Sequence, residues 1–592
     1  MAGGTTGGLR LSRWLPIAGW LPGYRRDDFA GDLTAGLITA IMLVPQSMAY
    51  AMLAGLPPTA GLYASILPLV LYGLFGSSRT LAVGPVAIAS LMTAASLVDV
   101  TARTGVGPVE AALTLALLSG GMYVAMGIVR LGFLVNFMSH HVIAGFTSAA
   151  ALVIGFSQLK HLLGLDLPRT HRIDQVLVNA AEAWQEVNLA ALLIGLAAIA
   201  LLLALRGPLP RLFARAGLPA GLVDRIAKAG PLLVVAFAIL AVSGLGLDAV
   251  GVAIVGEIPA GLPPVALPPL HPALVRELLP AAALITFIGY LESISVAKAL
   301  ASKRRQKIDA NQELVGLGAA NLAAGVSGGY PVAGGFGRSV VNFSAGARTP
   351  LASILTAALV ALTMLLLTPL LHDLPRAALA AIIIVAVAGL VDIASLRQAW
   401  RYNRADAAAM LLTFAAVLWL GVEEGIIVGI VTALALHLWR SSRPHIAVVG
   451  RLGDSEHFRN VLRYEVTTLP HLLLARVDES LYFANAAYLE DFLLGQVADR
   501  PQITDLVLIC SAVNAIDSSA LETLETLNEE LADAGVTLHL AEVKGPVMDR
   551  LKRSDFLDHL GGRIFLSTHQ AMVELGEPAP AEAAAEQSSG DT

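Results

Sequence analysis

The chain has 592 residues, of which 56% are hydrophobic and only 14% are charged. Soluble domains carry about a quarter charged residues, so this balance predicts a membrane protein. The formal net charge of -6 argues against nucleic acid as a partner. The single cysteine, Cys510, excludes a disulfide framework and any multi-cysteine metal site.

Residues 31–440 alternate apolar blocks with short polar connectors, and we expect a transmembrane domain there. Each block is long enough to cross a hydrocarbon core ~30 Å thick, and roughly fourteen spans are expected. Residues 1–30 lack the apolar core of a signal peptide, so we expect a cytoplasmic N-terminal segment and a first span that serves as its own insertion signal. The expected spans begin near Leu33, Ala60, Gly84, Ala111, Val142, Leu189, Pro231, Leu278, Glu313, Arg338, Leu351, Ala377, Ala407 and Gly425.

The distribution of arginine and lysine predicts the orientation. If the N-terminus with Arg25 and Arg26 is cytoplasmic, the even-numbered connections lie inside, and they hold most basic residues, including the run Lys303 to Lys307. The odd-numbered connection around residues 250–275 is almost free of them. This parity follows the positive-inside rule and predicts that the C-terminus is also cytoplasmic.

After residue 440 the pattern becomes that of a soluble domain. Strands that alternate with helices predict an α/β domain over residues 441–576. The tail, residues 577–592, is low in aromatic residues and rich in Ala, Glu, Pro and Ser, and we expect it to be disordered. The predicted elements are strands at residues 461–476, 505–510 and 536–540 and helices at residues 518–535 and 546–552.

Glycine and proline interrupt two of the predicted spans. Gly84-Pro85 precedes the third span, where the proline suits a first helical turn, and the run Gly325 to Gly337 precedes the tenth. If the spans divide into two sets of seven, these places are equivalent, and an odd number per set makes the second set inverted. Irregular backbone at membrane depth survives only inside protein or beside a water-filled cavity. The pattern therefore predicts a midplane substrate site.

A helix that begins at membrane depth offers unpaired N–H groups and about half a positive charge, which attract anions. Two such ends with one arginine nearby would define an anion site, and Arg338 is the expected cation because it is attached to the glycine-rich run. Alternatively, Arg338 pairs with a structural carboxylate or reaches the interface. The glycines can equally serve close helix packing.

Other polar residues in the predicted spans can take part. Glu292 on the eighth span can carry a proton with the substrate, form a fixed ion pair with Arg338, or bind a cation. Gln46 and Tyr50, four residues apart on the first span, share a helical face and can complete the site or bond a neighbouring helix. Because the soluble part has no catalytic triad, phosphate-binding glycine loop or metal cluster, we expect neither an enzyme nor a cofactor.

Two long segments carry specific motifs: VPQSMAYAMLAGLPPTAGLYASILPLVLYGLFGSSRTLAVGP (Val44 to Pro85) and LESISVAKALASKRRQKIDANQELVGLGAANLAAGVSGGYPVAGGFGRSVVN (Leu291 to Asn342). They resemble the SulP sulfate permeases, which include the solute carrier 26 anion transporters, and the C-terminal part resembles a STAS domain. The resemblance covers residues 20 to 575. It implies two inverted repeats of seven spans that form core and gate domains, a homodimer, and an anion held between the N-termini of spans three and ten.

The resemblance also implies site residues. Several family members have a serine where Gly337 stands, so one side-chain hydroxyl is missing here. Glu292 aligns with a glutamate that resembles the coupling carboxylate of proton-linked plant sulfate transporters, which favours proton–anion symport. The implied anion-binding residues are Gln46, Tyr50, Val86, Ala87, Gly337, Arg338 and Ser339.

The STAS domain resembles anti-sigma-factor antagonists, some of which are phosphorylated on a serine at the turn before a helix. Ser518 and Ser519 lie at such a turn and are candidate regulatory residues. Alternatively, Asp517 or Ser518 only caps the helix that follows.

Taken together, the sequence predicts a proton-coupled symporter for an inorganic oxyanion, with sulfate the leading candidate, in the cell membrane and most simply a bacterial inner membrane. A transporter for bicarbonate, with sodium as a possible coupling ion, a dicarboxylate transporter, or an anion exchanger are alternatives. A membrane-anchored regulator that signals through the STAS domain belongs to a different class. The expected partners are the anion, a proton or sodium, the lipid bilayer, a second copy of the chain and a cytoplasmic regulator.

Overall fold

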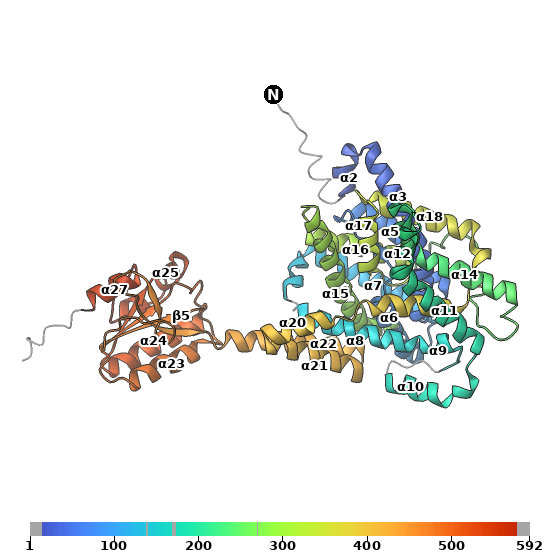
Figure 1. Ribbon diagram of the computed structural model, residues 1–592. Coiled ribbons are helices and arrows are strands. Elements are labelled where there is room, and N and C mark those ends of the chain that lie inside the picture. Colours follow the sequence, from blue (N-terminus) through green and yellow to red (C-terminus); the bar gives the residue numbers. More distant parts are fainter. Residues whose placement is uncertain (1–14, 138–139, 168–172, 269, 577–592) are drawn as a thin grey trace, which may run out of the picture. The chain divides into compact units, whose positions relative to one another are not determined.

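The computed structural model of the protein describes residues 15–137, 140–167, 173–268 and 270–576. The chain divides into two compact units, Met1–Ala433 and Leu434–Thr592, and the division falls inside one helix, α22 (Val422–Ser441). Figure 1 shows the first unit as a bundle of helices and the second as a sheet accompanied by helices.

The helices of the first unit follow the predicted spans. Each expected start lies in a helix or, for Gly84, three residues before one. The first seven spans are α3 (Arg26–Leu53), α4 with α5 (Pro58–Tyr63, Leu67–Phe75), α6 (Ala87–Thr104), α7 (Pro108–Ile128), α8 (His140–Ser157), α11 (Leu189–Arg206) and α14 (Gly230–Leu245). The second seven are α15 (Pro272–Lys303), α16 (Ala310–Val326), α17 (Phe336–Ser344), α18 (Leu351–Leu366), α19 (Arg376–Ala388), α21 (Arg404–Trp419) and α22.

Short helices connect the spans. Those that matter below are α9 (Leu159–Leu163) and α10 (Ile173–Glu182), which follow α8, and α12 (Pro208–Arg215) and α13 (Ala220–Lys228), which follow α11. The others are α2 (Ile17–Trp20) and α20 (Ile393–Tyr402), with 3-10 turns at Leu21–Gly23, Leu131–Phe137, Trp184–Glu186 and Thr368–Leu371.

Length and composition support a membrane location. In the described ranges, 8 helices or joined helix pairs are long and apolar enough to cross a bilayer. The remaining spans are shorter or less apolar, and α17, with 9 residues, is the shortest. A full crossing needs about 20 residues, so α17 can reach only part of the way across.

Glycines let α16 pack closely against α7. A Cβ atom on Gly318 would lie 2.9 Å from the backbone nitrogen of Val124, and one on Gly325 would lie 2.5 Å from the Cγ atom of Leu117. Gly325 is therefore a helical residue inside α16, and the prediction that the interrupted run starts there is wrong. Gly325 serves close helix packing, the alternative interpretation that the sequence left open for these glycines.

Pro85 was predicted to lie in the first turn of the third span, but it lies before the helix. The backbone of Val83 and Gly84 forms a short strand, Val86 is the N-cap residue, and α6 begins at Ala87. Because a neighbouring strand requires extended backbone at this point, the helix can begin only after the proline.

The second unit is an α/β domain with a six-stranded sheet. The strand order is β4-β3-β5-β6-β7-β8; β3 pairs antiparallel with β4 and β5, and the remaining pairs are parallel. The strands are β3 (Ile446–Arg451), β4 (Phe458–Asn460), β5 (Leu472–Val477), β6 (Asp505–Ile509), β7 (Thr537–Ala541) and β8 (Ile564–Phe565). The helices are α23 (Ala486–Ala498), α24 (Ser518–Asp533), α25 (Gly545–Leu551), α26 (Phe556–His559) and α27 (Thr568–Glu574).

The sheet is covered on both faces. Leu506 and Leu508 of β6 belong to a core cluster with residues of α23 and α24, whereas Val507 and Ile509 belong to a second cluster with Met572 of α27. Alternate residues of a strand point to opposite faces. Burial on both faces explains why β6 has the continuous apolar sequence from which it was correctly predicted.

Predictions for the second unit were partly right. The helix at residues 518–535 and the strand at residues 536–540 correspond to α24 and β7, and α25 was also expected. The prediction of a continuous strand over residues 461–476 is wrong. Only the last five of these residues lie in β5, and turns and isolated bridge partners make up most of the others.

Candidate functional site

The two interrupted segments meet in a two-stranded sheet in the interior of the first unit. Strand β1 (Val83–Gly84) pairs antiparallel with β2 (Ala333–Gly334), and Val83 lies opposite Gly334. All four residues are buried. Each strand leads into a helix, β1 into α6 and β2 into α17, and neither helix has a side-chain hydrogen bond at its N-cap. The first-turn N–H groups of both helices are therefore not satisfied by a capping side chain. We call each strand with its following helix a crossover.

Two glycines make this pairing possible. Gly84 has a φ of 150°, which residues with a side chain rarely adopt. A Cβ atom on Gly334 would lie 2.7 Å from a methyl carbon of Leu81, closer than packing allows. Gly84 and Gly334 thus serve backbone geometry at the paired strands.

Polar side chains of α17 hold the crossovers together. The Ser339 hydroxyl accepts a hydrogen bond of 2.9 Å from the backbone N–H of Ala82 and donates one of 2.7 Å to the carbonyl of Gly335. The Asn342 side chain donates to the carbonyl of Thr80 at 3.0 Å. Ser339 is fully buried and contacts backbone, so its hydroxyl is already occupied in this arrangement.

Arg338 is the buried cation of the site. Its side chain is 3% exposed, and one terminal guanidinium nitrogen donates a hydrogen bond of 2.5 Å to the carbonyl of Pro85. The other terminal nitrogen and Nε are buried and have no partner among the described residues. The carboxyl group of Glu292 and the hydroxyl groups of Tyr50 and Tyr330 lie near enough to interact electrostatically with the guanidinium group of Arg338. Because burying unpaired donors is unfavourable, the guanidinium is suited to accept a further ligand.

A cavity of about 600 Å³ opens beside the N-terminal turn of α17. Gly337 lines it and is exposed, with no atom within 4 Å of the place that a Cβ atom would take. Gln46 lines it from α3, and its buried side-chain oxygen has no partner among the described residues. Further lining residues come from α11 to α14 and from α19, among them Arg206, Lys228 and Ile382.

Six of the seven predicted anion-binding residues fall into two groups. Gln46 and Gly337 line the cavity, whereas Val86, Ala87, Arg338 and Ser339 are buried at the two helix starts. Tyr50 is buried one helical turn beyond Gln46 on α3 and does not line the cavity.

Three carboxylates of the first unit differ in their surroundings. Asp32 is fully buried and accepts hydrogen bonds from the N–H groups of Arg348 and Thr349, the Thr349 hydroxyl and the Tyr24 hydroxyl. Glu313 is also fully buried and accepts four, from Tyr72 and from three donors on Ser77 and Ser78.

Glu292 lacks such a shell. It is partly buried, one of its carboxyl oxygens is buried without a partner, and no hydrogen bond or ion pair of its side chain occurs in the described ranges. Of these three carboxylates, Glu292 is therefore the one whose hydrogen-bonding capacity the described residues do not satisfy.

Sequence reasoning missed the structural roles of three charged residues of the first unit. Arg206 served only to predict orientation, yet it lines the cavity and donates to the carbonyl of Val385 at 2.9 Å. Asp32 and Glu313 were not recognised as buried. No signal in a single sequence distinguishes a carboxylate that accepts four hydrogen bonds from one at a polar connector.

In the second unit, Asp517 of the predicted serine turn caps the helix that follows, as one of the two interpretations expected. Asp517 is the N-cap residue of α24, and its side chain accepts from the N–H of Ala520 at 2.8 Å and from that of Phe483 at 2.9 Å. Ser518 and Ser519 are both exposed at the start of the helix.

The fold and these crossovers define a class: a polytopic helical membrane protein with discontinuous spans and a separate α/β unit. The family model of the sulfate permease family matches residues 29–413, and that of the STAS domain matches residues 463–571. The chain belongs to the sulfate permease family and ends in a STAS domain.

Similar curated proteins are transporters of plants. The chain is 37% identical over 566 residues to the probable sulfate transporter 4.2 of Arabidopsis thaliana, covering 93% of this chain and 82% of that protein. It is 33% identical over 592 residues to the low affinity sulfate transporter 3 of Stylosanthes hamata, covering 95% of this chain and 90% of the relative.

Two solved structures share the fold. One is the murine solute carrier 26 family member A9 anion transporter in the inward-facing state, with a TM-score of 0.86 at 23% identity. The match covers 97% of this chain and 95% of the murine chain. The transmembrane domain of the cyanobacterial bicarbonate transporter BicA has a TM-score of 0.58 at 24% identity. The match covers 69% of this chain and 98% of the BicA domain.

Proposed function

We propose that this chain is a secondary active transporter that moves sulfate together with protons across the membrane. The observation that carries the proposal is the buried Arg338, which keeps two unpartnered guanidinium nitrogens beside two helix starts without side-chain caps. The names of the relatives as sulfate transporters support sulfate as the anion.

The anion is bound between the N-termini of α6 and α17. Backbone N–H groups at Val86, Ala87 and Gly337 carry no fixed countercharge, and the helix dipoles favour negative charge there. Arg338 supplies the net positive charge, and Ser339 fixes the position of the helix start. Gln46 and Tyr50 close the site from α3.

Glu292 is the coupling residue. With Glu292 ionised, its charge cancels that of Arg338; with Glu292 protonated, the pair carries one net positive charge. A dianion is attracted more strongly by the protonated pair, so proton and anion binding favour each other. The carboxyl group is partly buried and has no hydrogen-bond partner in the part of the chain that the structure describes, so it is free to change its protonation during the cycle.

Both termini are cytoplasmic in this proposal. α11 then ends, and α14 begins, on the cytoplasmic side, and the cavity lined by Arg206 and Gly230 opens to the cytoplasm. Transport requires that the site be exposed to each side in turn, by movement of the helices that bear the crossovers against those that line the cavity.

The STAS domain is proposed to control or assemble the transporter. A homodimer and phosphorylation at Ser518 or Ser519 are parts of this proposal, because both serines are exposed at the N-terminus of α24. A chain that ends at residue 445 should lose dimerisation, targeting or regulation of transport. If that chain behaves like the full protein in all three, the STAS domain has no such role.

Reconstituted proteoliposomes test the function directly. Uptake of labelled sulfate, bicarbonate and succinate is measured with an inward proton gradient, an inward sodium gradient or neither. The proposal predicts sulfate uptake stimulated by the proton gradient. Bicarbonate uptake stimulated by sodium, or succinate uptake, would assign a different substrate. Sulfate–sulfate exchange without net uptake would indicate an exchanger, and no uptake of any anion would favour a membrane-anchored regulator.

A further inference from the structure

The hydroxyl group of Tyr123 on α7 differs from those of comparable tyrosines. Buried tyrosine hydroxyls usually have a hydrogen-bond partner. The fully buried tyrosines among the described residues are Tyr72, Tyr123, Tyr290 and Tyr330. The partners of Tyr72, Tyr290 and Tyr330 are the carboxylate of Glu313 at 2.7 Å, the carbonyl of Gly132 at 2.7 Å and the hydroxyl of Ser90 at 3.0 Å. In the described ranges, the Tyr123 hydroxyl has no partner.

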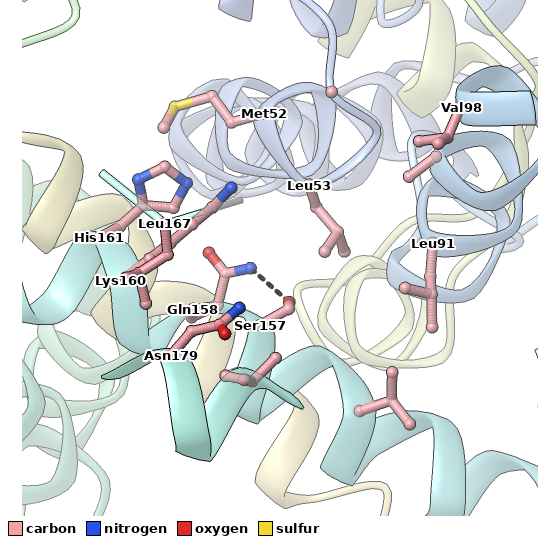
Figure 2. Close-up of a pocket in the computed structure, with 14 residues that line it drawn as sticks. Met52, Leu53, Leu91, Val98, Ser157, Gln158, Lys160, His161, Leu167 and Asn179 are labelled. Carbon is pink, nitrogen blue, oxygen red and sulfur yellow. Dashed lines mark hydrogen bonds between the residues drawn. The ribbon is translucent and has the colours of Figure 1, made fainter. Parts of the chain in front are cut away.

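An unpaired hydroxyl at this position lowers the stability of the fold. Tyr123 is 1% exposed, burying a polar group without a hydrogen bond is unfavourable, and phenylalanine would fill the same space. Figure 2 shows a buried polar side chain that is satisfied: in a pocket lined by residues of α3, α6 and α8 to α10, the Gln158 side-chain nitrogen donates to the Ser157 hydroxyl at 3.0 Å. We therefore expect the Tyr123 hydroxyl to take a partner in another state of the molecule.

Gly289 on α15 makes room for this hydroxyl. A Cβ atom on Gly289 would lie 2.4 Å from the hydroxyl oxygen of Tyr123, so any larger residue at this position would displace the tyrosine. The same Cβ atom would lie 3.4 Å from the Cβ atom of Ala333 in β2. The Tyr123 hydroxyl thus lies against α15 and beside the crossover that leads to Arg338.

The coupling carboxylate is on the next turn of α15. Glu292 follows Gly289 by three residues, and Cβ positions three apart on a helix are about 5–6 Å from each other on one face. Long side chains of a helix extend over the preceding turn, so Glu292 can reach the space that Gly289 leaves open. The carboxyl group and the Tyr123 hydroxyl lie near enough to interact electrostatically, and each has a buried oxygen without a partner among the described residues.

Three groups in the described ranges interact electrostatically with Glu292. They are the guanidinium group of Arg338 on α17 and the hydroxyl groups of Tyr50 on α3 and Tyr123 on α7. Ionised Glu292 is attracted to Arg338. Protonated Glu292 loses that attraction and is most stable with a neutral hydrogen-bond partner. Because Tyr50 is assigned to the anion, Tyr123 is left for the carboxyl group.

We propose that the Tyr123 hydroxyl donates a hydrogen bond to the carbonyl oxygen of protonated Glu292. The proposal deepens the proposed function and rests on it, because it takes the coupling role of Glu292 from there. When Glu292 binds a proton, its carboxyl group turns from Arg338 to Tyr123 and leaves the guanidinium group to the anion. Tyr72 and Glu313 make a similar tyrosine–carboxyl contact permanently. Tyr123 is thus a positioning residue that stabilises the proton-loaded site.

The proton dependence of sulfate uptake tests this role. In proteoliposomes, Tyr123→Phe should raise the proton concentration for half-maximal sulfate uptake about fivefold, because the protonated form loses one neutral hydrogen bond. The maximal rate should stay within about twofold, since phenylalanine fills the same space. An unchanged proton dependence of uptake overturns the proposal.

Tyr290→Phe is the matched control. It removes a buried hydroxyl that donates to the carbonyl of Gly132, so the temperature of unfolding should fall while the proton dependence stays as in the unmodified protein. Tyr123→Phe removes an unpaired hydroxyl and should not lower the temperature of unfolding. Equal changes of proton dependence in both variants would indicate a general structural effect and overturn the assignment to Tyr123.

Infrared difference spectroscopy tests the contact without transport. Acidification of the full-length protein in lipid should produce a C=O stretching band of protonated Glu292, which is identified by its absence in Glu292→Gln. A carbonyl group that loses a hydrogen bond absorbs at higher wavenumber. The band should therefore move to higher wavenumber in Tyr123→Phe and keep its position in Tyr290→Phe.

The outcomes separate the two proposals. A shifted band in Tyr123→Phe supports the contact even if a proton gradient does not drive sulfate uptake, and in that case the proposed coupling fails alone. A band at the same wavenumber in Tyr123→Phe and the unmodified protein overturns the inference and leaves coupling through Glu292 intact. Absence of a Glu292 band at low pH also overturns the inference, because the contact requires the protonated group.

Discussion

Helices α6 and α17 both begin a few residues after a strand of the same antiparallel pair, and both lack a capping side chain. Their fourth residues are serines, Ser90 and Ser339. Their third residues differ: Ala89 in α6 and Arg338 in α17. Two similar backbone arrangements thus supply two positive helix ends, and only one supplies a charged side chain. Binding is expected to need the backbone of both crossovers but the side chains of mainly one.

The largest loss of sulfate uptake is expected from Gly84→Val. This change distorts the backbone of the crossover formed by β1 and α6 and leaves Arg338 in place. A β-branched residue at a φ of 150° is strained, and its Cβ atom would lie 3.4 Å from a terminal nitrogen of Arg338. Strain of ~3 kcal/mol corresponds to about a hundredfold loss of sulfate uptake. Gly107→Val is the control, because Gly107 has a negative φ and open space around it. Equal activity of the two variants would show that the β1 geometry does not matter.

Glu292→Gln should remove proton coupling and preserve the fold. One pH unit is worth 1.36 kcal/mol, so a gradient of that size should raise sulfate accumulation about tenfold for each proton carried, and the variant should show no such rise. Glu313→Gln is the contrasting variant: it disturbs a carboxylate with four hydrogen bonds and should lower thermal stability instead. Stimulation by the proton gradient that persists in Glu292→Gln would exclude this residue as the coupling group.

Ser339→Ala tests whether the charged crossover is the more sensitive one. The change leaves the buried N–H of Ala82 without its side-chain acceptor, which costs about 1 kcal/mol, or about fivefold in the kcat/KM for sulfate. Ser90→Ala loses a hydrogen bond of 3.0 Å with Tyr330 at the equivalent position and should cost less transport. A larger loss from Ser90→Ala than from Ser339→Ala would reverse the comparison.

The smallest effect is expected from Gly337→Ser. The added hydroxyl extends into open space at the edge of the cavity, so the fold should tolerate it. One additional neutral hydrogen bond is worth at most about 1 kcal/mol, so the KM for sulfate should fall by no more than about fivefold. A change in substrate preference from sulfate to bicarbonate would show instead that this position sets specificity.

The spans could be predicted from sequence because lipid imposes a length and a polarity on each of them. The interruption before α17 was visible for the same reason, since its glycines and Arg338 conflict with an apolar span. The boundary at Gly325 was misjudged because glycine occurs both in tight helix packing and in irregular backbone. Only the neighbouring helix, here Leu117 of α7, distinguishes the two.

The geometry of the candidate site could not be predicted from residue patterns alone. The contacts of Arg338 with Pro85 and of Ser339 with Ala82 join residues 253 and 257 positions apart. Such pairs leave no periodicity in a single sequence. In the STAS domain, β6 was recognised because both its faces are buried. The strand predicted in the stretch before β5 was wrong because alternating apolar and polar residues in an exposed turn resemble the pattern of a strand.

The most direct test of the account is equilibrium binding of labelled sulfate to the purified protein and to Arg338→Gln. The control is Arg348→Gln, which removes an exposed arginine that pairs with Asp28. Both variants should remain folded by size-exclusion chromatography. We predict that sulfate binding is lost in Arg338→Gln and preserved in Arg348→Gln. Sulfate affinity in Arg338→Gln equal to that of the unmodified protein would contradict an anion site between α6 and α17.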